Sequence, residues 1–342
     1  MKRRQFLRDT TLSLATLPYI HRNLAPEEVI LGHNDHRYRL DRHWGDLNPH
    51  VIPVKDCHEM IQDKQGRIFL LTNETKNNVI IYNKDGKPIK TWGTTYPGAH
   101  GLTLSEEGGE SFLYICDNNR HEVIKTTLDG REIMVLPYPA ESGKYESADK
   151  YIPTETTIAP NGDIYVADGY GAQYIIHYDS QGKLKNVFGG RGPSPANFDN
   201  AHGIALDTRM PGEPTLLITA RQQNKLKRFS LSGELIKEIP VPGAYICRPV
   251  IHGDYVYCAT LISHLPWDSG SGFVTILDKN DQVVSVPGGS APVYTNGQLD
   301  PLFQTVQAFK HPHDVCVDED ENLYIAQWNS DKVYPYKLTR VA

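Results

Sequence analysis

The chain has 342 residues, of which 39% are hydrophobic and 22% charged, an ordinary composition for a globular protein with a large core. The formal net charge is −6 and no long basic run occurs, which argues against a nucleic-acid partner. No apolar run reaches the ~18 residues that a membrane-spanning helix needs. The 28 Gly and 23 Pro indicate many turns, and the 19 Tyr fit strands better than helices.

The N-terminal segment has the order of residues found in export signals. Residues 2–8 are basic and the run 11–17 is mildly apolar. The core Arg3-Arg4-Gln5-Phe6-Leu7 resembles a twin-arginine signal, which implies a periplasmic or extracellular protein that is exported after folding. A disordered basic terminus is the alternative. We expect residues 1–25 to be this signal and residues 26–342 to form one domain.

A unit of four short strands then recurs at roughly 40–50 residues, a period typical of propellers and solenoids. In the clearest copy, Ile164–Asp168 reads as the second strand, Tyr174–Tyr178 as the third, and Asp179–Lys183 as a hairpin turn. The same turn recurs at Asp85-Gly86. Six copies start near the following residues: Cys57, Ala99, Pro153, Ala201, Cys247 and Pro312. The repeat predicts an all-β, six-bladed propeller of the NHL kind, with no helix of ten residues after residue 25.

The sixth copy has only three strands, predicted at 314–317, 323–326 and 333–338, before the chain ends. Residues 38–45 resemble the fourth strand of the first copy, which ends in Lys90-Thr91-Trp92-Gly93. We therefore expect the N-terminal strand to complete the last blade, because a closed ring has no exposed edge strands.

Five cysteines form no CxxC pair, so a thiolate zinc site is not indicated. Cys247 and Cys258 flank the turn at His252-Gly253 and lie roughly opposite each other in the predicted hairpin. A disulfide between them is left open by the sequence, and at least one thiol must stay unpaired within the chain.

Three histidines occupy the same place in their repeats, just before the first strand. They are His100 in Ala-His-Gly-Leu, His202 in Ala-His-Gly-Ile and His313 in Pro-His-Asp-Val, which belong to blades two, four and six. Alternate blades of a six-bladed ring lie about 120° apart, and the first strand of each blade is nearest the axis. The three imidazoles are thus predicted to converge on a metal site with an open position. Neutral imidazole suits zinc, copper, iron or nickel, so the metal is Zn²⁺ or another transition metal.

Two further histidines lie close in the sequence. His58 holds the equivalent place in blade one, as a fourth ligand, a substrate contact or neither. His311 precedes His313 by two residues, and strand alternation points it elsewhere along the channel mouth. Both are additional candidates for the site.

Three stretches resemble the lyase domain of peptidylglycine α-amidating enzymes. They are residues 151–170, 197–204 and 309–315, within a resemblance that spans about 240 residues of blades two to six. In that family a six-bladed propeller holds a catalytic zinc through three His and splits a C-terminal α-hydroxyglycine into an amide and glyoxylate. The resemblance implies that His100, His202 and His313 are the ligands in this chain. It also leaves room for a structural Ca²⁺.

The resemblance further implies roles for three other residues. Tyr170 matches an active-site tyrosine, which near a cation can take a proton. Arg221 matches an arginine near the site, suited to a carboxylate, and Asp314 matches an acidic residue there. The chain departs from the family at Gly171, where the family has cysteine, and at His311, where it has methionine. Lys55, Cys57 and His58 fill the stretch in which the family has its first-blade arginine.

These observations predict a metal-dependent lyase acting on a small or peptide-like substrate, or a hydrolase using the same metal-activated oxygen. The alternatives are a non-catalytic NHL propeller that binds protein or glycan, and a lactonase-like propeller. A binding propeller needs no ring of histidines, and a lactonase-like site favours carboxylate and Asn ligands on a hard cation. The sequence does not indicate an oligomeric state.

Overall fold

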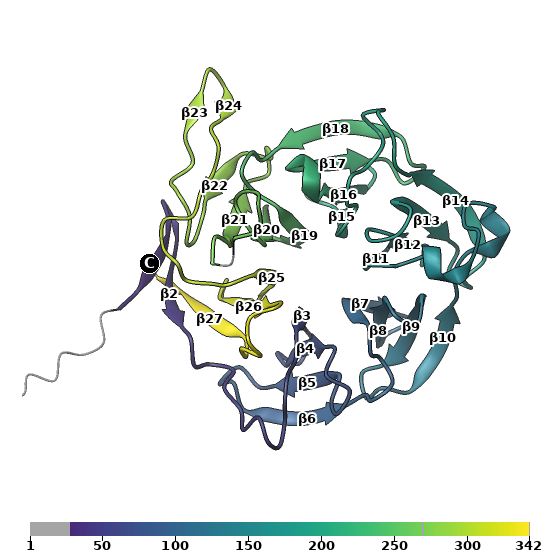
Figure 1. Ribbon diagram of the computed structural model, residues 1–342, viewed down its shortest axis with the longest axis horizontal. Coiled ribbons are helices and arrows are strands. Elements are labelled where there is room, and N and C mark those ends of the chain that lie inside the picture. The colour runs from purple at the N-terminus through teal and green to yellow at the C-terminus, as the bar shows by residue number, and fades with distance from the viewer. Residues whose placement is uncertain (1–27, 269, 342) are drawn as a thin grey trace, which may run out of the picture.

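The computed structural model describes residues 28–268 and 270–341, which form six antiparallel sheets arranged as blades around one axis (Figure 1). The expected signal at residues 1–25 lies outside the described residues. The six-bladed, all-β architecture predicted from the repeat is confirmed. Each blade begins within three residues of its predicted start, because the turn and strand patterns recur once per blade.

The first three blades each have four strands, which follow one another from the axis outward. Blade one is β3 (Cys57–Gln62), β4 (Ile68–Thr72), β5 (Val79–Tyr82) and β6 (Pro88–Trp92). Blade two is β7 (Ala99–Glu107), β8 (Glu110–Asp117), β9 (Glu122–Thr127) and β10 (Glu132–Leu136). Blade three is β11 (Glu155–Ile158), β12 (Ile164–Ala167), β13 (Tyr174–Tyr178) and β14 (Leu184–Gly189).

The other three blades follow the same plan. Blade four is β15 (Ile204–Asp207), β16 (Thr215–Ala220), β17 (Lys225–Phe229) and β18 (Leu235–Pro240). Blade five is β19 (Ile246–His252), β20 (Tyr255–Thr260), β21 (Phe273–Leu277) and β22 (Val283–Ser285), and a hairpin of β23 (Tyr294–Thr295) and β24 (Gln298–Leu299) follows it. Blade six begins with β25 (Pro312–Val317), β26 (Leu323–Gln327) and β27 (Tyr336–Val341). Helical turns in the described chain are the short 3₁₀ segments η1 (Ala140–Ser142), η2 (Ala148–Lys150) and η3 (Arg221–Gln223).

Blade six also contains two strands from the start of the described chain. β2 (His36–Asp41) pairs antiparallel with β27, with Arg37 opposite Val341 and Asp41 opposite Lys337. β1 (Ile30–His33) pairs with β2 and adds a fifth strand. The pairing strand lies earlier than the expected range 38–45, because the segment from Arg42 to Gly45 turns instead of staying extended.

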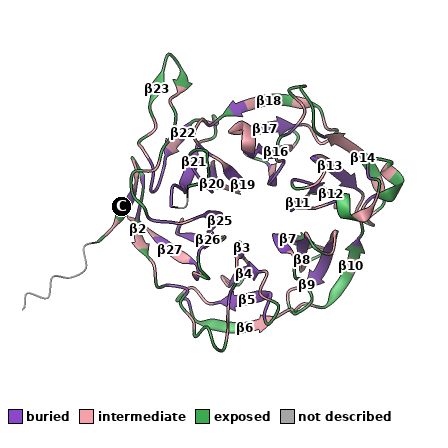
Figure 2. Cartoon of the chain, viewed as in Figure 1, coloured by how far each residue is buried: buried purple, intermediate pink, exposed green. Residues whose placement is uncertain are grey.

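The outermost strands of the blades are more exposed than the strands inside them (Figure 2). All five residues of β4 and all four of β5 are buried, whereas the outer β6 is mainly exposed. The core lies between neighbouring blades, as where Leu217 and Leu226 of blade four pack with Val256 and Phe273 of blade five. Each such side chain stabilises the fold by about 1.5–3 kcal/mol. Packing of this kind therefore joins neighbouring blades.

The predicted hairpin turn closes as expected. Gly86 has a φ of +78°, and a Cβ on it would lie 1.8 Å from the carbonyl oxygen of Trp44. The position therefore needs glycine both for its left-handed backbone and for space. All five cysteines are buried and free, so the disulfide between Cys247 and Cys258 that the sequence left open does not form in this structure.

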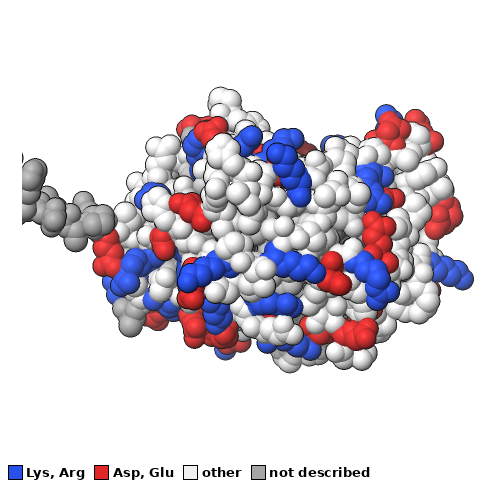
Figure 3. Space-filling view, turned by 90° about the horizontal axis from the view of Figure 1, so that it is seen from below, with Lys and Arg blue, Asp and Glu red and all other residues white. Residues whose placement is uncertain are grey.

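Charged side chains of both signs occur on the face seen in Figure 3. Lysine and arginine side chains are interspersed with aspartate and glutamate along the edge of the disc (Figure 3). Among the described residues, no helix has the length and apolar character needed to cross a bilayer.

Candidate metal centre

Four histidines meet near the axis because they stand at one end of the inner strands. His58, His100 and His313 are each the second residue of β3, β7 and β25, and His202 lies two residues before β15. At each of the first three positions the strand register shifts, which marks a β-bulge at the histidine. A bulge re-aims a side chain and is common beside functional sites. We call these four residues the imidazole layer.

The rings of the imidazole layer are packed against one another. The ring centroid of His100 lies 4.8 Å from that of His202 and 4.9 Å from that of His313, and His202 and His313 are 5.0 Å apart. His58 lies 4.8 Å from His100 and 4.9 Å from His313. The rings of the three residues predicted as ligands thus lie together, with His58 beside them. The ligand atoms within 4.8 Å of one another form two groups, His58 with His100 and His313, and Cys247 with His202 and His313.

Each of the three predicted ligands is held by the following blade. Nδ1 of His100 is 2.8 Å from the carbonyl oxygen of Thr154, Nδ1 of His202 is 2.9 Å from that of Cys247, and Nδ1 of His313 is 3.0 Å from that of His58. A carbonyl only accepts, so Nδ1 carries the proton and Nε2 is left with its lone pair. Hydrogen bonds of this kind orient metal-binding imidazoles.

Burial keeps these rings neutral. It holds the pKa of His100, His202 and His313 well below 6.5, and it lowers that of His58 to about 3. Nε2 of His313 and Nδ1 of His58 have no hydrogen-bond partner among the described residues. Buried polar atoms are almost always satisfied, so these orphaned atoms are a reason to expect a ligand at this point.

The hydroxyl of Tyr170 lies between two of the predicted ligands. It is 3.2 Å from Nε2 of His100 and 2.9 Å from Nε2 of His202, although the residue as a whole is 36% exposed. The loop that presents it is built by Asp168, whose carboxylate accepts hydrogen bonds from the backbone N–H groups of Ile152 and Ala172. Burial raises the pKa of Tyr170, and the neighbouring Arg221 acts in the opposite direction.

Arg221 reaches the same point from η3 in blade four. Its Nη2 is 3.5 Å from the Tyr170 hydroxyl, and its Nη1 is 3.8 Å from Sγ of Cys247. Arg221 is buried, and its Nε has no partner in the described chain. Cys247 was not predicted for the site, yet its Sγ lies within 4.8 Å of the donor nitrogens of His202 and His313. Burial raises its pKa to about 11, so the thiol stays protonated.

Two predicted site residues lie apart from the Tyr170 hydroxyl. Asp314 is fully buried and accepts hydrogen bonds from Arg248 and from the backbone N–H of Met60. His311 precedes β25, and its ring lies 6.0 Å from that of Trp267 and 5.8 Å from that of Trp328, measured between centroids. Asp314 therefore stays a candidate for a catalytic role through the resemblance, and His311 stays an additional candidate for the site.

The space around position 171 explains why this residue is glycine. A Cβ at this position would lie 2.1 Å from Oδ1 of Asp168 and 2.4 Å from the carbonyl oxygen of Lys150. The loop that presents Tyr170 therefore has no room for the cysteine that the resembling family carries there.

A cavity of 280 Å³ opens beside the imidazole layer. Its walls include Lys55, His58, His100, Asn118, Tyr170 and Trp328. Tyr170 and two of the four histidines thus line it, with a lysine and an indole ring at its wall. A larger cavity of 470 Å³ lies at the other end of the inner strands, but none of the four axial histidines lines it.

The sequence relatives of the chain are amidating enzymes and NHL-repeat proteins. Peptidylglycine alpha-amidating monooxygenase of Rattus norvegicus is 23% identical over 278 residues, 77% of this chain and 25% of that protein. Peptidyl-alpha-hydroxyglycine alpha-amidating lyase 1 of Drosophila melanogaster is 26% identical over 275 residues, 73% of this chain and 47% of that protein. NHL repeat-containing protein 3 of Homo sapiens is 24% identical over half of each chain, 50% and 51%. The chain thus spans a quarter to a half of the length of these relatives, and no known family profile matches it.

Solved structures show the same fold. A streptogramin B lyase has a TM-score of 0.58 at 16% identity and covers 88% of this chain and 97% of its own. A gluconolactonase from Xanthomonas campestris has a TM-score of 0.58 at 15% identity, with 88% and 89% covered. At this identity the likeness concerns architecture, which hosts several chemistries.

Proposed function

We propose that the chain is an exported metal-dependent lyase that resembles peptidyl-α-hydroxyglycine amidating lyase. One observation carries the proposal: three imidazoles on alternate blades are each held through Nδ1 by the next blade, which leaves three Nε2 atoms at the axis. A propeller that only binds protein or glycan needs no such arrangement.

The donor set fits a transition metal. His100, His202 and His313 would hold the ion, because their imidazoles are neutral, oriented and close together, and the buried Nε2 of His313 lacks a partner among the described residues. Neutral imidazole suits zinc, copper, iron and nickel. His58 is less suited, because its Nδ1 is not held by a neighbouring carbonyl of the described chain.

The reaction implied by the resemblance breaks the carbon–nitrogen bond of a hemiaminal. The substrate hydroxyl loses a proton, its oxygen becomes the aldehyde carbonyl of glyoxylate, and the bonding electron pair leaves with the amide nitrogen, which takes a proton. A bound metal ion supplies Lewis acidity at the substrate oxygen. Tyr170 is placed to carry the proton, since its hydroxyl adjoins two ligand nitrogens and Arg221.

The residues around the cavity suit a substrate with a carboxylate. Lys55 stands at the cavity wall, and Arg221, which does not line the cavity, contacts the Tyr170 hydroxyl through Nη2 and has a buried Nε that no described residue satisfies. Both are donors for an anionic group. Trp328 adds an apolar wall for the remainder of a small or peptide-like substrate.

The proposal is tested by glyoxylate release from a peptide ending in α-hydroxyglycine, with untagged protein before and after chelation. We expect turnover that chelation abolishes and that Zn²⁺ or another transition metal restores. Metal-dependent hydrolysis of lactones or esters without glyoxylate release would replace the lyase by a hydrolase. Absence of both activities and of bound metal would leave a binding propeller.

Export is a separate part of the proposal and rests on Arg3-Arg4 and the apolar run 11–17. Replacing both arginines with lysine should keep the protein in the cytoplasm. Unchanged export of that variant would end the twin-arginine hypothesis.

A further inference from the structure

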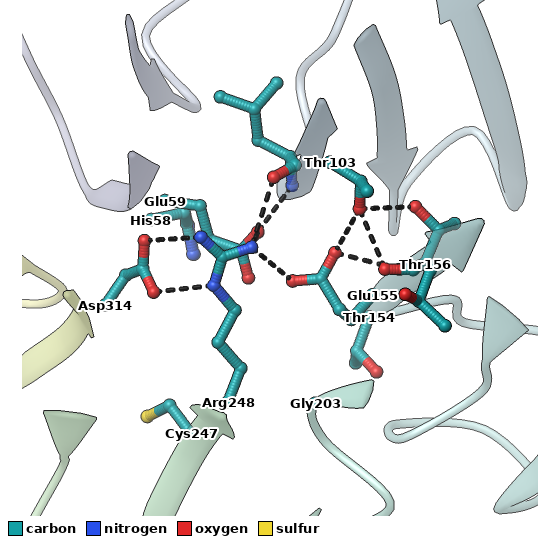
Figure 4. Close-up of polar contacts among 12 residues, drawn as sticks. His58, Glu59, Thr103, Thr154, Glu155, Thr156, Gly203, Cys247, Arg248 and Asp314 are labelled. Atoms are coloured by element: carbon teal, nitrogen blue, oxygen red, sulfur yellow. Dashed lines mark hydrogen bonds and ion pairs between the residues drawn. The ribbon is translucent and has the colours of Figure 1, made fainter. Parts of the chain in front are cut away.

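A second group of residues lies one position further along the same inner strands. The equivalent positions of the six blades are, in blade order, His58, His100, Thr154, His202, Cys247 and His313. The residues that follow them are Glu59, Gly101, Glu155, Gly203, Arg248 and Asp314. The four charged members are buried and meet at the axis (Figure 4). We call Glu59, Glu155, Arg248 and Asp314 the salt-bridge layer.

The guanidinium of Arg248 is surrounded by oxygen atoms from four other blades. Its Nε and Nη2 donate to Asp314 at 2.6 and 2.9 Å, and its Nη1 lies 3.2 Å from carboxylate oxygens of both Glu59 and Glu155. Two backbone carbonyls complete the set. Nη2 donates to the oxygen of Met60 at 3.0 Å, and Nη1 donates to that of Leu102 at 3.2 Å.

Glycine makes room for this arrangement. A Cβ on Gly203 would lie 2.3 Å from Cβ of Arg248 and 2.4 Å from its Cα. Blade four therefore contributes no side chain to the salt-bridge layer. The empty place lets the backbone of Arg248 come close to the neighbouring blade while its side chain crosses the axis.

The oxygen atoms around Arg248 are those that a hard divalent cation selects. Ca²⁺ takes carboxylate and backbone carbonyl oxygens at about 2.3–2.6 Å. The resemblance leaves room for a structural Ca²⁺, but the guanidinium lies against all of these oxygens, so the residues present do not fit a calcium ion. We propose that Arg248 is a tethered internal cation, which takes the place of a divalent metal ion at the axis and makes the propeller independent of calcium.

The same cation also supports the imidazole layer. The carbonyls that hold the three predicted ligands belong to His58, Thr154 and Cys247, and the next residue in each case is Glu59, Glu155 or Arg248. Asp314 in turn follows the ligand His313. A cation that gathers the salt-bridge layer thus fixes the backbone on which the imidazoles depend, which makes Arg248 a positioning residue. This second role rests on the proposed metal centre, but the replacement of calcium does not.

The test is thermal unfolding of the full chain in EGTA and in CaCl₂, with calcium titration by calorimetry. The wild-type midpoint should be the same in both buffers, and wild-type protein should bind no calcium at the axis. Arg248→Ala should unfold at a lower temperature in EGTA and regain roughly 5 °C or more in calcium. It should bind about one Ca²⁺ per chain. Arg248→Lys, which keeps a cation, should respond to calcium less than Arg248→Ala.

Two controls make the result specific. Arg228→Ala removes another buried arginine, which pairs with Asp207 and Asp281, and it should lower the midpoint without a calcium response. Transition-metal binding is measured in parallel, and calcium should restore it in Arg248→Ala if the salt-bridge layer positions the ligands. A wild-type midpoint that rises in calcium overturns the proposal. So does an Arg248→Ala protein that folds without a calcium response, or that stays unfolded even in calcium. A wild-type protein that binds no transition metal, with the calcium results as described, would instead count against the proposed function.

Discussion

The imidazole layer and the salt-bridge layer lie at adjacent positions of the inner strands and share β3 and β25, yet their polar atoms differ in how many have hydrogen-bond partners. In the salt-bridge layer, all three nitrogens of the Arg248 guanidinium have oxygen partners. In the imidazole layer, Nε2 of His313 and Nδ1 of His58 have none in the described chain. A satisfied buried network holds a structure in one arrangement, whereas orphaned buried atoms indicate a group that the site takes up. The difference assigns support to one layer and chemistry to the other.

The largest effect is expected from removing a metal ligand, which should lower metal affinity. His313→Ala should lower transition-metal affinity at least about 100-fold, because one of the three nitrogens that bind the metal is lost. Changes to residues that only hydrogen-bond to a ligand already cost about 10–100-fold. His58→Ala, the matched control beside it, should change affinity less than about tenfold. Competition with a metal-binding dye measures both. Equal losses in the two variants would mean that His58 is a full ligand.

Tyr170→Phe should separate metal binding from catalytic turnover. The change removes only the hydroxyl, so metal binding should persist while turnover falls about 10²–10⁴-fold. Tyr114→Phe, which removes a hydroxyl that donates to Glu107 and has no contact with the Tyr170 loop, is the matched control and should retain most activity. A fully active Tyr170→Phe enzyme would end the proton-carrying role of this residue.

In the salt-bridge layer, substitution should affect stability first. Arg248→Met leaves the buried carboxylates of Asp314, Glu59 and Glu155 without their cation, which should cost about 3–5 kcal/mol of unfolding free energy without added calcium. Lys64→Met removes an exposed partner of Glu106 and should cost at most about 1 kcal/mol. Chemical denaturation in EGTA measures both. Similar losses would show that the salt-bridge layer is no more than a surface ion pair in its effect.

A smaller effect is expected from an ion cluster outside the axis. Burial alone would raise the pKa of Asp207, but Arg209 and Arg228 hold it at about 2, below its usual 3.8. Because the folded-state pKa is depressed, the stabilisation is present above pH 4 and is lost as the pH falls toward 2. Asp207→Asn should remove about 2 kcal/mol of the fall in unfolding free energy between pH 4 and pH 2. Asp85→Asn, on an exposed turn, is the control. An unchanged acid limb in Asp207→Asn would contradict the assignment.

The sequence predicts the ring of blades well because each blade repeats one turn and one strand pattern. The placement of His100, His202 and His313 follows from the same repeat, since equivalent residues of alternate blades must face a common axis. The salt-bridge layer was missed. Glu59 and Asp314 each follow a histidine, but Glu155 follows Thr154 and Arg248 follows Cys247 in the most degenerate repeat. A lone arginine in a strand does not reveal which carboxylates it meets.

Other features depend on packing that no local pattern encodes. The contact of Cys247 with Arg221 joins blades four and five, and Cys247 lies where the strand register shifts between Ile246 and Pro249. The position of the Tyr170 hydroxyl between two imidazoles depends on the loop that Asp168 ties down. Residue identity suggested the role of Tyr170, whereas only the folded loop gives its distance to the ligands.

We propose that three tethered imidazoles bind one transition metal at the axis. This proposal is tested most directly by the metal content of untagged protein, measured by mass spectrometry for the wild type and for His202→Ala. We predict about one ion per chain in the wild type and almost none in the variant, with both proteins giving the same β-rich circular dichroism spectrum. Stoichiometric metal that survives the loss of His202, or a folded wild-type protein that takes up no transition metal on titration, would contradict the account.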